Sequence, residues 1–294
     1  MFKIKAIFPL FALLMLMITL PVNSQENQSQ LTTGPEKGSL MVVGGGRLTD
    51  VIMERFLELA GGSEAKIVVI PTASGAESYD DDYYFLQRLK DFGAINVSLL
   101  HTYDKEEADS EGFIQPLKDA QAVWFGGGRQ WRLVDAYADT KTEKMIWEVL
   151  SRGGVVGGSS AGATIQGSYL ARGDTQNNQV MMGDHEEGFG FIKNVAIDQH
   201  LLARNRQFDM FSILKHRPEL LGIGIDERTA IVVNQNTFEV LGDGKVAIYD
   251  GTFWSREGSE LKNLPPKEHL FYFLQRFDKY DLKNRQVITD TNGE

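Results

Sequence analysis

The sequence predicts an α/β fold, a three-layer α/β/α sandwich built on a mostly parallel sheet. Two observations predict it. Short, continuous apolar runs alternate with longer amphipathic segments over the first half of the chain, and strands buried on both faces of a parallel sheet have this composition. Most of these runs also end in glycines or a turn, and the carboxyl ends of parallel strands are where such sheets place their sites.

The elements of the first half can be assigned in order. Short apolar runs predict five strands, at residues 40–43, 67–70, 97–100, 122–125 and 155–158. Amphipathic segments predict helices between most of them, at residues 50–59, 83–92, 131–137 and 144–152. Thr49 or Asp50 is placed to cap the first helix, and Pro71 ends the second strand.

The second half of the chain is richer in strands. We expect them at residues 195–198, 222–226, 229–233, 238–241 and 245–249. An aromatic segment at 269–277 predicts a helix near the C-terminus. Since no linker-like composition follows residue 38, residues 38–294 are assigned to one domain with a C-terminal extension from about residue 256.

The N-terminal residues have the layout of a secretory signal peptide over residues 1–24. Lys3 and Lys5 precede an apolar run at 6–20, and a breaker and small residues lead to a predicted cleavage after Ser24. The alternative is a retained anchor, but the run is shorter than the roughly 20 residues of a spanning helix. We therefore expect a periplasmic or secreted protein, free of the membrane after cleavage, with residues 25–37 as a linker.

Composition excludes several classes of chemistry. The chain has no cysteine, which rules out a cysteine nucleophile, thiolate metal sites and disulfides. Without the predicted signal, which holds two lysines and no acidic residue, 28 basic side chains face 40 acidic ones, a net charge of −12. Such a surface repels phosphate backbones, so we expect no nucleic-acid partner.

The strongest motif is Gly-x-Ser-x-Gly at 158–162. It follows a predicted strand and precedes a helix-like segment, the context in which a nucleophilic serine occupies a sharp turn. Ser160 is the predicted nucleophile, and the amide of Ala161 is placed to stabilise an oxyanion. The structural alternative is a glycine-rich turn that only packs a helix onto a strand.

A serine nucleophile needs a base, and the chain has five histidines. His200 stands out because it ends an apolar run and is followed by Arg204 and Arg206, which are suited to holding carboxylates. The acid that orients the imidazole is left open at this point. The candidates are Asp174, Asp198, Asp226 and Glu227.

On these residues the chain resembles the S51 peptidases, most closely the cyanophycinase branch of that family. The resemblance covers about residues 38 to 255. It is carried by the Ser-Ala-Gly-Ala block at 160–163, the Asp-Gln-His block at 198–200 and the Asp-Glu-x-Thr-Ala block at 226–230, together with glycine-rich turns at 44–46 and 126–128. It implies a sandwich similar to class I glutamine amidotransferase domains.

The resemblance also implies roles for individual residues. Spacing within the family makes Asp174 the first choice for the acid and Glu227 the second. The glycine-rich turn suggests that the amide of Gly127 or Gly128 joins Ala161 in the oxyanion hole. The substrate-binding positions carried over from the family are Gln130, Asp198, Gln199, Arg204 and Arg206.

Three positions depart from the family pattern. Ser159 stands where threonine is usual, and Arg129 stands where the glycine-rich turn usually has aspartate. Asp209 stands where cyanophycinase has a further arginine. This last change reverses a charge in the pocket and weakens the case for cyanophycin as the substrate.

We therefore predict an exported serine peptidase that uses no metal or cofactor and cleaves Asp-containing peptides, including β-aspartyl-arginine links, through an acyl-enzyme. The oligomeric state is left open, with a homodimer as one expectation. The first alternative is a non-catalytic binding protein that retains the fold. The second is glutamine amidotransfer, which needs the cysteine that this chain lacks.

Overall fold

The computed structural model describes residues 31–289. The predicted signal peptide lies outside the described residues, as does the first part of the predicted linker. No helix in the described part of the chain is both long and apolar enough to cross a bilayer.

A nine-stranded sheet forms the centre of the molecule, and its parallel part consists of β1, β5, β4, β2 and β3 in spatial order. Their bounds are Ser39–Val43, Val155–Ser159, Ala122–Phe125, Lys66–Ile70 and Asn96–Leu99. All five lie within a residue of the predicted strands. The predicted α/β class with a mostly parallel core is confirmed.

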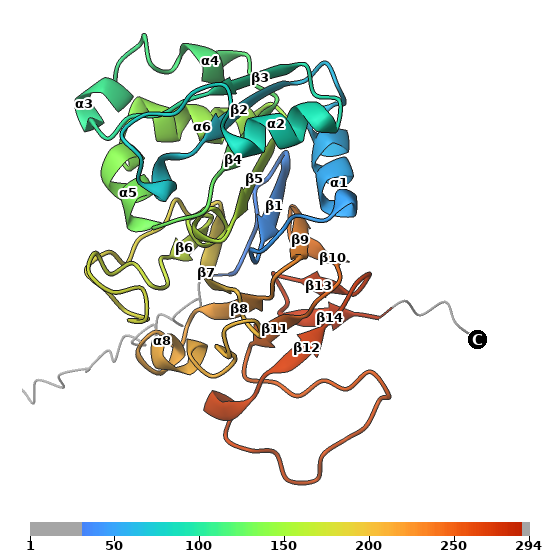
Figure 1. Cartoon of the computed structure of the whole chain (residues 1–294). Coiled ribbons are helices and arrows are strands. Elements are labelled where there is room, and N and C mark those ends of the chain that lie inside the picture. Colours follow the sequence, from blue (N-terminus) through green and yellow to red (C-terminus); the bar gives the residue numbers. More distant parts are fainter. Residues whose placement is uncertain (1–30, 290–294) are drawn as a thin grey trace, which may run out of the picture.

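Helices cover both faces of this parallel part (Figure 1). One face packs on α1 (Asp50–Ala60) and α2 (Tyr84–Asp91), through apolar side chains such as Phe56 and Phe85. The other face packs on α4 (Gln115–Lys118), α5 (Trp131–Tyr137), α6 (Lys141–Ser151) and α7 (Ala161–Thr164), and the short α3 (Lys105–Ala108) lies beside them. Thr49 caps α1, as the sequence predicts, by accepting a hydrogen bond from the amide of Ile52.

The nine-stranded sheet continues as an antiparallel extension beside β1. It is formed by β9 (Thr229–Asn234), β10 (Thr237–Gly242), β13 (Lys279–Asp281) and β14 (Gln286–Ile288). Figure 1 shows this extension below the helix-covered part. It places residues 279–288 against the rest of the domain.

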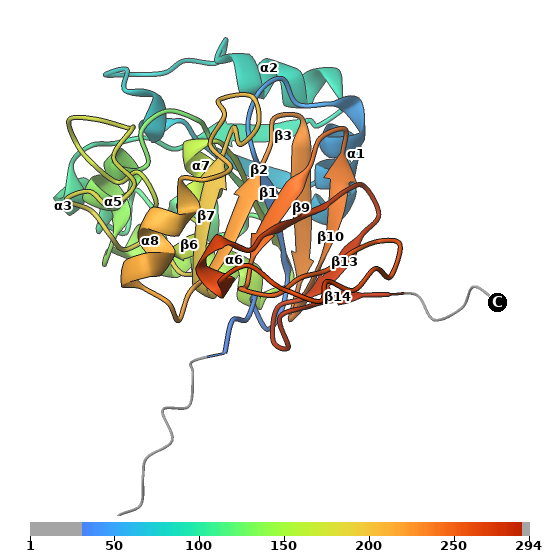
Figure 2. The same cartoon turned by 90° about the horizontal axis from the view of Figure 1, so that it is seen from below.

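A second sheet of five strands was not predicted as a separate layer. Its strands are β12 (Tyr272–Leu274), β11 (Val246–Tyr249), β8 (Leu221–Ile225), β7 (Ile192–Gln199) and β6 (Gly167–Tyr169). One face shares a core with the large sheet, and the other packs on α8 (Met210–His216), which is visible beside β6 and β7 in Figure 2.

The predicted helix at 269–277 is wrong. The segment forms a short 3-10 turn at Lys267–His269 and then strand β12. Tyr272 and Leu274 are buried while Phe273 between them is half-buried, a two-residue alternation that suits a strand paired with β11. Aromatic content alone favoured neither structure, and pairing across the sheet decided it.

Candidate active site

Ser160 occupies the sharp turn between β5 and α7. Its backbone angles are φ 57° and ψ −112°, a sparsely populated conformation that costs about 1–3 kcal/mol for a residue with a side chain. The amide of Ser160 donates to the carbonyl of Val43 at 3.0 Å, which ties the turn to the end of β1. The predicted strand–turn–helix context of the nucleophile motif is therefore present.

His200 follows β7 and faces Ser160 from the second sheet. Its Nε2 atom lies 2.9 Å from Oγ of Ser160. Its own amide donates to the carbonyl of Gly44 at 2.8 Å. The turn after β1 thus holds both residues of the pair, since Val43 binds the serine and Gly44 binds the histidine.

Gly45 makes room for the imidazole. Its φ is +118°, and a Cβ at this position would lie 2.2 Å from Cε1 of His200. A side chain here would be strained by the backbone angle and would also displace the ring. Gly45 therefore forms the surface against which the histidine packs, and its neighbour Gly46 packs against the side chain of Glu227.

Glu227 supplies the carboxylate next to His200. It follows β8, the strand that pairs with β7, and its Oε1 lies 2.6 Å from Nδ1 of the imidazole. This geometry corrects the first choice of acid, Asp174. In the structure Asp174 lies in the loop between β6 and β7, where its carboxylate accepts hydrogen bonds from the amides of Gln176 and Asn177.

The two other candidate acids also have different partners. Asp198 is buried in an ion pair with Arg172. Asp226 accepts hydrogen bonds from the amides of Leu202 and Ala203, which stabilises the turn after His200. Glu227, the second choice from the family resemblance, is the residue that the structure places beside the imidazole.

The electrostatics around His200 favour a neutral imidazole. Burial lowers the pKa of His200 below its ordinary value, and the hydrogen bond to Glu227 opposes this shift. The positive charges of Arg204 and Arg206 lower the pKa further. The ring is therefore uncharged at neutral pH and can accept a proton from Ser160.

Three backbone amides around Ser160 have no acceptor among residues 31–289: those of Gly127, Gly128 and Ala161. A Cβ built on Gly127 would lie 3.4 Å from Cβ of Ser160, so the turn after β4 runs directly beside the nucleophile. The sequence motif predicted Ala161 as an oxyanion donor, and the family resemblance added the amide of Gly127 or Gly128. The structure places the turn next to the serine and leaves the three N–H groups available.

The predicted substrate-binding residues fall into two groups. Gln130, Asp198, Gln199 and Arg206 are buried and bonded within the protein. The side-chain Nε2 of Gln130 donates to the carbonyls of Ala171 and Arg172. Nη1 of Arg206 donates to the carbonyl and to the side-chain oxygen of Gln199. These residues build the wall of the site rather than its open surface.

Arg204 is the exception among them. It is exposed, and its amide donates to the carbonyl of His200 in the turn that follows the imidazole. None of the carboxylates in residues 31–289 lies within ion-pair distance of its guanidinium. It is therefore the predicted arginine that is free to meet a ligand.

Sequence reasoning missed Arg172. This side chain is 1% exposed and forms a two-point ion pair with Asp198 at 2.8 and 2.9 Å. It also donates to Asp209 at 2.6 Å, so the departure from the family pattern at that position has a partner in this chain. No periodic pattern or motif singles out an arginine that follows a three-residue strand.

Two of the other histidines, His101 and His185, lie in other surroundings. His101 shares a hydrogen bond with Thr72 and packs edge-on against Tyr79 and Tyr103. His185 is bonded to Asp135 and Asp184, and these bonds raise its pKa against the effect of burial. Within the described part of the chain, no group of three or more acidic or histidine side chains is placed to hold a metal ion.

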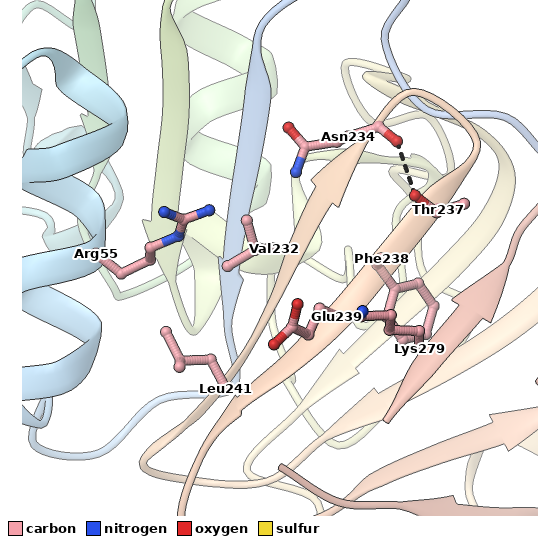
Figure 3. A pocket seen from close by; sticks show the side chains of 8 residues that line it. All are labelled: Arg55, Val232, Asn234, Thr237, Phe238, Glu239, Leu241 and Lys279. Carbon is pink, nitrogen blue, oxygen red and sulfur yellow. Dashed lines mark hydrogen bonds between the residues drawn. The ribbon is translucent and has the colours of Figure 1, made fainter. Parts of the chain in front are cut away.

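A cavity of about 290 Å³ lies away from Ser160, between α1 and the antiparallel extension (Figure 3). Arg55, Glu239 and Lys279 contribute charged groups to its lining. Asn234, the last residue of β9, accepts a hydrogen bond from Ser39 at the start of β1, whereas Ser160 follows Ser159, which pairs with Val43 at the end of β1. The cavity therefore contributes nothing to the serine–histidine–glutamate cluster.

Comparison with known proteins agrees with this geometry. The family model described as "Peptidase family S51" matches residues 40–241. The chain is 32% identical over 264 residues to a cyanophycinase of Geminocystis herdmanii, covering 86% of this chain and 96% of the relative. It is also 32% identical over 287 residues to a cyanophycinase of Trichormus variabilis, covering 92% and 94%.

A solved structure is similar as well. A crystal structure of a peptidase from an acI-B1 actinobacterium superimposes with a TM-score of 0.61 at 28% identity. The match covers 84% of this chain and 98% of that one. The similarity thus extends over the sheets and helices that position the cluster around Ser160.

Proposed function

The chain belongs to peptidase family S51 and is a serine-type peptidase, and on that premise we propose that Ser160, His200 and Glu227 are its catalytic triad. The observation that carries the proposal is the continuous chain of two hydrogen bonds, 2.9 Å from Ser160 to His200 and 2.6 Å from His200 to Glu227. A nucleophile, a base and an orienting acid are the three parts that acyl transfer requires.

The reaction follows from the geometry. Oγ of Ser160 attacks the scissile carbonyl while Nε2 of His200 takes the hydroxyl proton. Glu227 holds the Nδ1–H and stabilises the imidazolium that forms. The oxyanion accepts hydrogen bonds from Ala161 and from the glycine turn at 127–128. His200 then returns its proton to the leaving amine, and a water activated by the same base releases the acyl group from Ser160.

We propose a peptide with an aspartyl residue as the substrate, including β-aspartyl-arginine links. The relatives in the comparison are named for cyanophycin. Arg204 has no ion-pair partner among residues 31–289, and its charge acts on His200, which supports a substrate with a free carboxylate near the scissile bond. Asp209, which is paired with Arg172 and whose side chain is 40% exposed, adds a carboxylate to this region.

We also propose that residues 1–24 direct export to the periplasm or the outside of the cell. The basic start, the apolar run and the small residues before position 25 support this. N-terminal sequencing of the protein recovered from fractionated cells tests it. A chain that begins at Gln25 in the exported fraction is the expected result, and an uncut chain in the cell interior contradicts it.

Labelling with a fluorophosphonate probe tests the catalytic proposal. The wild type should be labelled on Ser160, as located by mass spectrometry of the modified peptide, and should cleave members of a panel of α- and β-aspartyl peptides. A protein that is neither labelled nor able to cleave any panel member would instead be the non-catalytic binding protein that the sequence left as an alternative.

A further inference from the structure

We propose that Arg172 is a positioning residue that fixes the substrate pocket without touching the reacting atoms. This inference rests on the proposed function, because the pocket matters only if Ser160 is the nucleophile. Three facts carry it: the hydrogen bonds of its guanidinium, the segments from which its partners come, and its separation from the triad.

All five N–H groups of the Arg172 guanidinium have acceptors. Nε and Nη2 donate to the two carboxylate oxygens of Asp198 at 2.8 and 2.9 Å, and Nη2 also donates to Asp209 at 2.6 Å. Nη1 donates to the carbonyls of Asn178 and Gln179 at 3.3 and 3.4 Å. No donor is left for a ligand, so any effect of this arginine on the substrate acts through its neighbours.

These partners come from separate segments that meet at the site. Asp198 lies on β7, two residues before His200, and Asp209 immediately precedes α8. The carbonyl of Arg172 itself accepts a hydrogen bond from Gln130, two residues after Gly128. The side chain of Arg172 therefore joins the histidine-bearing strand, the loop at 178–179 and the segment before α8, and its backbone carbonyl adds a link to the glycine turn.

The same cluster includes Arg206, one of the two arginines predicted to bind the substrate. Nη1 of Arg206 lies 3.8 Å from Asp198, so this carboxylate is shared between two guanidinium groups. Burial lowers the pKa of Arg206 to about 10, which still leaves it cationic at neutral pH. Removal of Arg172 would leave the buried Asp198 with the amide of Gln199 and one long ion-pair contact to Arg206, and Asp209 would lose its bond to the guanidinium.

The triad has its own supports. The amides of Ser160 and His200 bind the carbonyls of Val43 and Gly44, and the imidazole packs on Gly45. None of these contacts involves Arg172. Loss of Arg172 should therefore disturb substrate binding while the reactivity of Ser160 is retained.

The test uses two variants: one removes both partners of the buried Arg172–Asp198 ion pair, which also takes from Arg206 its 3.8 Å carboxylate contact, and the other keeps the cation. Arg172→Met combined with Asp198→Asn removes both charges, and Arg172→Lys keeps the charge but loses the planar fork. We expect fluorophosphonate labelling of Ser160 within about twofold of wild type and a KM for β-aspartyl-arginine raised by about tenfold or more, with kcat changed less. Hydrogen exchange should become faster in residues 173–184 and 200–209.

Arg55→Met is the matched control, since Arg55 forms an exposed ion pair with Glu58 on α1. It should change none of these quantities. Unchanged KM and kcat in the Arg172 variants would overturn the inference, because the residue would then have only a structural role. Loss of labelling in parallel with kcat would also overturn it, because Arg172 would then act through the triad.

Asp209→Asn covers the case in which both buried variants fail to fold. It weakens the bond between Arg172 and the half-exposed side chain of Asp209. We therefore expect a smaller rise in KM, together with faster hydrogen exchange in residues 173–184. No change in either quantity would overturn the inference. Failure of the wild type to be labelled is a different result, since it contradicts the proposed function itself.

Discussion

Nδ1 of His200 lies 2.6 Å from Oε1 of Glu227, two residues that are 27 positions apart in the chain. The contact forms because β7 and β8 are parallel neighbours, so that their carboxyl ends reach the same edge of the second sheet. On the other side of the imidazole, β5 of the large sheet delivers Ser160. The cluster is thus assembled where the ends of strands from two sheets meet.

The Glu227 contact predicts which carboxylate matters. Glu227→Gln should lower kcat by about 10⁴-fold with little change in substrate affinity, because the imidazole loses the partner that fixes its tautomer and stabilises its cation. Steady-state kinetics on a cleaved aspartyl peptide measures this. Asp174→Asn is the control, and we expect about wild-type turnover since the amide oxygen can still accept the hydrogen bonds within its own turn. A larger loss of turnover in the Asp174 variant than in the Glu227 variant would show that Asp174, in the loop between β6 and β7, is the catalytic acid.

The nucleophile can be separated from the serine beside it. Ser160→Ala should lower kcat by about 10⁶-fold and leave the melting temperature nearly unchanged. Ser159→Ala should have a small effect, since Ser159 ends β5 and is not the residue bonded to His200. Equal losses of activity in the two variants, measured on the same peptide, would show that the nucleophile was assigned wrongly.

Gly45 packs closely against the imidazole, so a side chain at this position should lower both stability and kcat by more than its backbone strain alone explains. Gly45→Ala should destabilise the fold by about 1 kcal/mol or more and lower kcat, because the new methyl group would displace the His200 ring. Gly61→Ala is the matched control. Gly61 also has a positive φ, of 105°, but open space around it, so we expect a smaller shift in melting temperature, from backbone strain alone, with kcat unchanged.

The lowered pKa of His200 fixes the direction of a pH effect. Only the neutral imidazole can accept the proton of Ser160, so the labelling rate should fall as pH drops through this pKa, at a pH below the ordinary value of 6.5. Arg204 disfavours the imidazolium, so Arg204→Gln should raise the pKa and move the acid limb of the rate profile to higher pH. Fluorophosphonate labelling is the readout because it does not depend on the aspartyl pocket.

Salt supplies the control for this charge effect. Arg204 is exposed, so its influence on His200 is screened by salt, and the difference between Arg204→Gln and wild type should shrink in concentrated sodium chloride. The profile of Arg55→Gln should coincide with that of wild type. An acid limb that moves to lower pH in the Arg204 variant would contradict the proposed electrostatics.

Local sequence was sufficient to predict the elbow at Ser160, because the strand, the turn and the following helix are contiguous. It also indicated His200 at the end of a strand. The acid could not be chosen in this way, because the choice between Asp174 and Glu227 depends on which strand lies beside β7. Arg172 was beyond sequence reasoning for the same reason, since its partners are joined only by the fold.

The charge of Asp209 leads to the prediction about specificity. Its carboxylate is tied to Arg172 through one oxygen and is 40% exposed, so it keeps a negative charge at a position where cyanophycinase has an arginine. We expect detectable but inefficient cleavage of cyanophycin and a higher kcat/KM for another Asp-containing peptide. The measurement is kcat/KM for cyanophycin and for a panel of short α- and β-aspartyl peptides.

Asp209→Arg tests whether this position sets the preference. The variant should shift kcat/KM toward cyanophycin, while Asp209→Asn separates loss of the negative charge from gain of a positive one. Because the new arginine would face the buried cation of Arg172, the melting temperature of each variant must be measured alongside the kinetics. A folded Asp209→Arg variant with no gain on cyanophycin, and a wild type that already prefers cyanophycin to every panel peptide, would show that specificity is decided elsewhere in the pocket.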